Sequence, residues 1–108
     1  HPDHIAAGEA TISAVFPASR DRLTFPELIE EGLEPHKVRE LLVSGTSNPD
    51  KWIDVSETTE IAIEALLKHV SQVNPENEPG KWMKERRRKA GEHVGMLYAE
   101  SYKHFHLA

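Results

Sequence analysis

The chain has 108 residues, with 38% hydrophobic and 29% charged side chains and a formal net charge of −5. This length is enough for one small domain spanning residues 1–108, and we expect a soluble globular protein without a membrane span. The acidic balance argues against a broad nucleic-acid interface. The chain contains no cysteine, so any metal would need nitrogen and oxygen ligands. A reducing, cytoplasmic location fits this composition.

Two helices are predicted in the first third of the chain. Residues 5–16 are rich in alanine and end at Pro17, whose ring and missing N–H interrupt a helix. Residues 25–32 form a short helix with proline in the first turn and glycine past the end. The next two segments, VRELLVSG at 38–45 and KWIDV at 51–55, are predicted to be short strands, the first with a well-buried face.

The second half of the chain is predicted to be mainly helical. Ser56 is expected to cap a helix whose apolar face consists of Ala62, Ala65, Leu66, His69, Val70 and Val73. A long final helix is predicted from Lys81 to about Tyr102, with Val94, Leu97, Tyr98, Ser101 and Phe105 on one stripe. The basic run at 84–89 is interpreted as a solvated helix face, and residues 104–106 as a frayed tail.

These elements indicate an α/β fold with about three main helices and two short strands. Two short strands cannot form a stable sheet alone, so the remaining strands are expected upstream. The chain begins with His1 instead of methionine, which agrees with this expectation. We therefore interpret residues 1–108 as the C-terminal part of one α/β domain. Unpaired strand edges in such a segment also favour association into homo-oligomers.

The first four residues, His1-Pro2-Asp3-His4, combine two imidazoles and a carboxylate. These are zinc ligands, and the proline is expected to keep the segment extended. A catalytic zinc takes three protein ligands, so this segment could supply only part of a site. In the competing interpretation the histidines cap the following helix and Asp3 lies near its positive end. The spacing fits both interpretations equally well.

The motif resembles the second signature of the LmbE-like and PIG-L-type metal-dependent deacetylases, HPDHxAxG. Further segments in the same order are similar to that family, namely Gly32–Val38, Trp52–Ser56, His69 with Ser71 and Gln72, and Gly95–Glu100. The resemblance implies a Rossmann-like domain that hydrolyses the N-acetyl amide of N-acetylglucosamine-type sugars. It also implies that the family's first signature, AHPDDE, which supplies two metal ligands and the general base, lies in an N-terminal half outside these residues.

Carried over to this chain, the resemblance assigns three roles. His4 becomes a ligand of Zn²⁺ or another divalent metal. His1 becomes the acid that polarises the amide and protonates the departing amine, and Asp3 orients its ring. Without the other ligands and the base, the isolated chain is expected to be inactive.

Two other function classes are compatible with the sequence. A non-catalytic binding or assembly module could retain part of the deacetylase fold. A terminal histidine and a second histidine could also chelate copper, although the downstream similarity argues against this. His69 and His36 are interpreted as structural residues first, and the resemblance leaves open a supporting role near the site for each.

Overall fold

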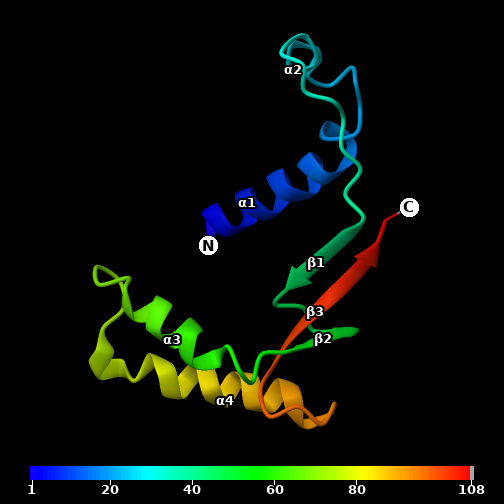
Figure 1. The fold of residues 1–108 in the computed structure, drawn as a ribbon. Coiled ribbons are helices and arrows are strands. Elements are labelled where there is room, and N and C mark those ends of the chain that lie inside the picture. Colours follow the sequence, from blue (N-terminus) through cyan, green and yellow to red (C-terminus); the bar gives the residue numbers. More distant parts are fainter. Residues whose placement is uncertain (108) are drawn as a thin grey trace. The chain divides into compact units, whose positions relative to one another are not determined.

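The computed structural model describes residues 1–107 of the chain. Within them lie four α-helices and three β-strands, so the fold is mixed α/β. The chain divides into two compact units, one formed by 1–41 and 106–108 and the other by 42–105. No helix in the described part of the chain is both long and apolar enough to cross a bilayer. Each unit is described separately below (Figure 1).

The first unit contains the two predicted N-terminal helices. Helix α1 covers Pro2–Ser13 and continues into one π-helical turn, Ala14–Ala18; helix α2 covers Pro26–Glu30. Each of these two α-helices has proline in its first turn. A backbone N–H at that position has no intrahelical acceptor, so proline, which lacks the N–H, costs no hydrogen bond there. The extended segment after α2 is fixed by the backbone N–H of His36, which donates to the Ser19 carbonyl at 2.7 Å.

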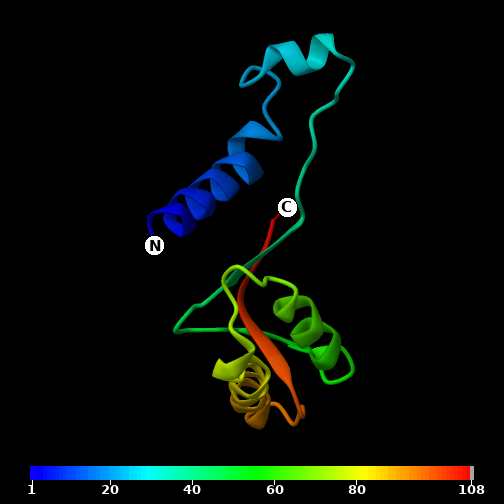
Figure 2. The same ribbon diagram turned by 90° about the vertical axis from the view of Figure 1, so that its left-hand side faces the viewer.

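The sheet contains β1 (Glu40–Ser44), β2 (Lys51–Asp54) and β3 (Ala99–His106), in the order β1-β3-β2. Strands β2 and β3 are antiparallel, and Trp52 lies opposite Ser101 in their register. The strands at 38–45 and 51–55 were therefore predicted correctly, apart from their exact ends. The last strand along the chain is the central strand of the sheet, as Figures 1 and 2 show.

Two helices pack together in the second unit, α3 (Thr59–Leu67) and α4 (Pro79–Glu92) (Figures 1 and 2). Their close approach depends on Gly80, because a β-carbon there would lie 3.0 Å from the Ile63 side chain. At the other end of α4, a β-carbon at Gly91 would collide with the carbonyl oxygen of Met96. Only glycine therefore lets the chain fold back so tightly after α4.

The predicted final helix from Lys81 to Tyr102 was correct as far as Glu92 and wrong beyond it. Helix α4 ends at Glu92, and Gly95 follows with a left-handed φ of 71° that ends the turn. Residues from Ala99 onward form β3, so the histidines at 104 and 106 lie in a strand and are not a frayed tail. The helical stripe was misleading because pairing with the neighbouring strands, which the local pattern does not show, decides the conformation of this segment.

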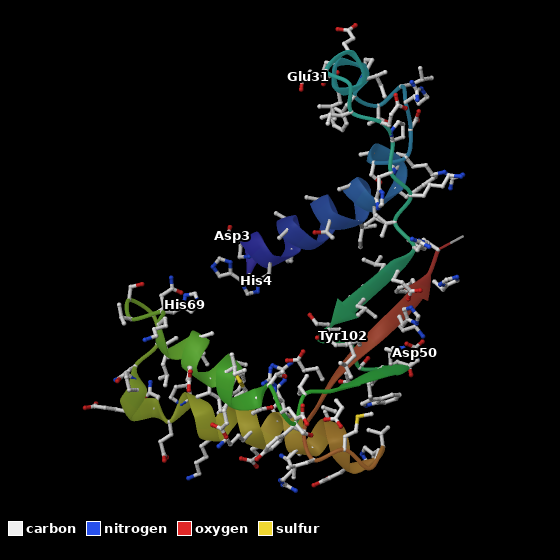
Figure 3. The ribbon with its side chains drawn as sticks, in the orientation of Figure 1. Asp3, His4, Glu31, Asp50, His69 and Tyr102 are labelled. Atoms are coloured by element: carbon white, nitrogen blue, oxygen red, sulfur yellow. The ribbon has the colours of Figure 1, made fainter. Side chains whose placement is uncertain are left out.

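The helix after Ser56 also differs from the prediction. Thr58 is its N-cap, and Ser56 instead donates to the Asp54 carboxylate at 2.6 Å and accepts from the Tyr98 N–H at 3.2 Å. Helix α3 ends at Leu67, six residues before the predicted end of the apolar stripe. His69 is therefore exposed on the following turn and does not lie on a buried helix face (Figure 3).

The sheet leaves most of its apolar side chains accessible. In the described residues, Ile63 and Ala99 are the hydrophobic side chains that are buried. The predicted well-buried face of β1 is absent, since Leu42 is 39% and Val43 37% exposed, and Ile53 on β2 is 38% exposed. A core of this size provides little hydrophobic stabilisation, so the second unit should be marginally stable when isolated.

Candidate functional site

The His1–His4 cluster forms the start of α1. Pro2 is the first helical residue, and Asp3 lies in the first turn, near the positive end of the helix dipole. His1 is the N-cap, because its Nδ1 accepts a hydrogen bond from the Asp3 backbone N–H at 3.2 Å. The prediction of an extended segment was wrong. A proline restricts the residue before it, but the residues after it remain free to enter a helix.

One helical turn brings the three predicted site residues together. The ring centroids of His1 and His4 are 5.4 Å apart, with an angle of 41° between the ring planes. All three side chains are open to solvent, and the Asp3 side chain is 89% exposed. Figure 3 shows Asp3 and His4 at the free end of α1. The cluster thus presents two imidazoles and one carboxylate on an open surface.

Capping and ring orientation compete for the same atom of His1. Its Nδ1 accepts from a backbone N–H, so in this state the ring proton of a neutral His1 is on Nε2. The Asp3 Oδ2 atom lies 3.7 Å from Nδ1, which is too far for a hydrogen bond. The two groups are adjacent, as the orienting role requires. A hydrogen bond between them could form only after the bond from the Asp3 backbone N–H to His1 Nδ1 breaks.

The donor set of the cluster fits zinc. Imidazole nitrogen and carboxylate oxygen are ordinary zinc ligands. Among residues 1–107, however, no group of three or more histidine, cysteine or acidic side chains is arranged to hold a metal ion. The cluster alone therefore provides at most part of a coordination sphere.

The other two histidines discussed above have backbone roles in the structure. His69 is exposed, and its carbonyl accepts hydrogen bonds from the N–H groups of Gln72 and Val73 at 3.0 and 2.8 Å. His36 is also exposed, and it fixes the extended segment through its own N–H. In both cases the observed contacts hold a loop in place and involve no side chain of the cluster.

A polar network that the sequence did not predict connects α4 with β3. The Arg87 guanidinium pairs with the Glu100 carboxylate and donates to the Thr59 hydroxyl at 3.3 Å. The Tyr102 hydroxyl donates to the other oxygen of Glu100 at 2.5 Å. The Arg87 side chain is only 12% exposed, so the interpretation of 84–89 as a wholly solvated face was wrong at this position. Arg87 lies four residues after Met83 and four before Gly91, on the inner face of α4, and this spacing was the sequence signal that indicated its burial.

This network shifts two pKa values in opposite directions. The hydrogen bond from Tyr102 lowers the pKa of Glu100, and Arg87 lowers it further. The same hydrogen bond raises the pKa of Tyr102, because the hydroxyl must keep its proton to donate it. Glu100 therefore favours its charged form when the protein is folded.

The lowered pKa of Glu100 predicts a loss of stability in acid. A carboxyl whose pKa is lower in the folded chain stabilises it above the ordinary value of 4.5, and this contribution disappears as the pH falls through the folded value. Tyr102→Phe should raise the pKa of Glu100 towards 4.5, so the stability lost in acid should be smaller and the loss should be complete at a higher pH. Carboxyl NMR titration and urea unfolding between pH 3 and 7 would measure both effects.

The matched control is Tyr98→Phe, which removes a hydroxyl that makes no hydrogen bond to Glu100 in the described structure. It should leave the Glu100 titration unchanged. An equal shift of the Glu100 pKa in both variants would contradict the assignment to the Tyr102 hydrogen bond.

The chain is similar to a diacetylchitobiose deacetylase. That protein, from Thermococcus kodakarensis, is 35% identical over 72 residues, which are 67% of this chain and 27% of the relative. The chain therefore corresponds to only about a quarter of the length of that deacetylase. No family model matches the chain, and no solved structure matches it significantly.

The similarity to diacetylchitobiose deacetylase points in the same direction as the HPDH motif. It does not test the roles of His1, Asp3 and His4, which remain predictions.

Proposed function

We propose that this chain is part of a zinc-dependent deacetylase of the LmbE-like and PIG-L-type family. It would hydrolyse the N-acetyl amide of an N-acetylglucosamine-type sugar or conjugate. The observation that carries this proposal is the 35% identity to a deacetylase over two thirds of the chain. The clustering of His1, Asp3 and His4 on one turn of α1 supports it, because the three groups are close enough to act on one substrate.

In this proposal, the cluster supplies one part of the site. His4 would hold zinc together with ligands from residues outside this chain, and the bound metal would supply an activated water and polarise the acetyl carbonyl. His1 donates a proton from its ring to the amine nitrogen as the carbon–nitrogen bond breaks, leaving acetate and the free amino sugar. Asp3 orients the His1 ring once His1 gives up its capping bond to the backbone.

The exposed apolar residues of the strands support the proposal that this chain is one part of a larger Rossmann-like domain. Leu42, Val43 and Ile53 are each more than a third exposed, although all three lie on strands. Apolar strand residues are normally covered by a second layer. We propose that the N-terminal half of the domain supplies this layer together with the remaining ligands and the general base.

Acetate release tests the proposed function. The intact protein, assayed with N-acetylglucosamine and diacetylchitobiose, should release acetate; a chelator should abolish the activity and zinc should restore it. The 108-residue chain alone should release none, even with added zinc. Binding of these sugars without hydrolysis would instead favour a non-catalytic module, and turnover by the isolated chain would contradict the partial site.

A further inference from the structure

A groove in the second unit is separate from the His1–His4 cluster. Its volume is about 530 Å³, within the range of small-molecule sites. We call it the α4 groove. It is lined by one face of α4, by the start of β3, and by the end of β1 with the turn that follows, which includes Ser44, Gly45 and Thr46. A β-carbon at Gly45 would contact nothing within 4 Å, so the groove is open at this end.

The charge of the α4 groove is positive. Its charged side chains are Arg86, Arg87 and Glu100. Arg87 is paired with Glu100, whereas Arg86 forms no salt bridge in the part of the chain that the structure describes and acts on Glu100 only from a longer distance. The Arg86 guanidinium instead stacks over Trp82, with its Cζ atom 5.7 Å from the ring centroid. The indole holds this guanidinium in place and leaves its N–H groups available to an anion.

Hydroxyl groups at the β1 end of the groove can complete an anion site. Thr46 Oγ1 accepts a hydrogen bond from the Asn48 N–H at 3.1 Å, so its hydroxyl hydrogen remains available to donate. Ser44, which also lines the groove, carries a second hydroxyl that can donate. A phosphate group accepts several hydrogen bonds at once, and a guanidinium can bind two of its oxygens together.

We propose that the α4 groove binds a small organic phosphate monoester. Arg86 and the hydroxyls of Ser44 and Thr46 hold the phosphate, and the groove volume left over accommodates the organic part against Trp82 and Met83. Inorganic phosphate would use only a small part of this volume. None of the lining residues belongs to the His1–His4 cluster, so the inference does not depend on the proposed deacetylase activity.

Calorimetric titration of the intact protein tests the ligand class. Glucose 6-phosphate and adenosine monophosphate are the two probes, because a sugar and a nucleoside are different carriers of the same group. At least one should bind saturably and more tightly than inorganic phosphate, and glucose should not bind. The inference fails if neither ester binds saturably, if glucose binds as well as its phosphate, or if inorganic phosphate matches both esters.

Two variants of the same helix locate the binding. Arg86→Gln removes the guanidinium in the groove and should weaken ester binding by about 10-fold or more, the effect of a charge-assisted hydrogen bond. Arg88→Gln makes the same charge change at an exposed residue that pairs with Glu92 and does not line the groove. It should leave the affinity unchanged. Equal weakening by both variants would mean that only the net charge of the chain matters.

Arg86→Lys separates charge from geometry. Lysine keeps the positive charge but lacks the planar fork, so its affinity should lie between those of the unmodified chain and Arg86→Gln. Circular dichroism should show the same helix content in every variant, because Arg86 and Arg88 are both exposed. Full affinity in Arg86→Gln with intact folding would overturn the inference.

Discussion

His4→Ala is expected to release zinc from the intact protein and to abolish acetate release. In the proposed site, His4 is one of three protein ligands, and a catalytic zinc cannot keep its coordination with two. Both the activated water and the polarised carbonyl depend on the metal, so the whole rate enhancement should be lost. The measurement is bound zinc per chain by elemental analysis, together with kcat for acetate release from N-acetylglucosamine.

The control for this experiment is His93→Ala. His93 is exposed and lies at the C-terminal end of α4, outside the cluster. It should keep both zinc and activity. Helix α1 should form in both variants, since no side-chain hydrogen bond holds His4 in the structure. Full zinc occupancy in His4→Ala would contradict the assignment of His4 as a ligand.

Local sequence signals predicted the elements whose ends are marked by special residues. Proline opens α2, and turn residues such as Gly45 and Asn48 separate β1 from β2, whereas the start of α1 at Pro2, three residues before the predicted start, was missed. These signals act within a few residues, because proline fixes its own φ and glycine allows left-handed backbone. The positions of these elements could therefore be predicted without any knowledge of tertiary contacts.

The elements that depend on distant partners were not predictable in this way. The segment Ala99–His106 carries an apolar pattern that fits a helix, yet it pairs with β2, which lies about fifty residues earlier in the chain. Arg87 is held inside by Glu100 and Thr59, contacts that no local pattern reveals. Pairing across the sheet and burial of a satisfied charge outweigh the intrinsic preference of the local sequence.

The candidate site shows the same division between local and distant information. The motif predicted which residues gather at the start of the chain, and the structure places His1, Asp3 and His4 on one turn. The competing interpretation, in which the histidines cap the helix and Asp3 lies near its positive end, is confirmed for His1 and Asp3, whereas His4 lies inside the first turn of α1. The second function of His1 makes a simple alanine substitution ambiguous, because Ala also removes the cap.

His1→Asn separates these two functions and should lower kcat by a factor of about 10² to 10⁴ while zinc remains bound. Asparagine is a good N-cap, so α1 should keep its start, whereas His1→Ala would also destabilise the helix by about 1 kcal/mol. Asparagine cannot donate a proton to the departing amine, so the fall in kcat reports the loss of the acid.

Asp3→Asn should give a smaller fall in kcat, because it misorients the His1 ring without removing it. Bound zinc and kcat are measured for each variant beside His4→Ala. If His1→Asn empties the metal site and His4→Ala leaves it full, the ligand and the acid are the reverse of those proposed for this turn of α1.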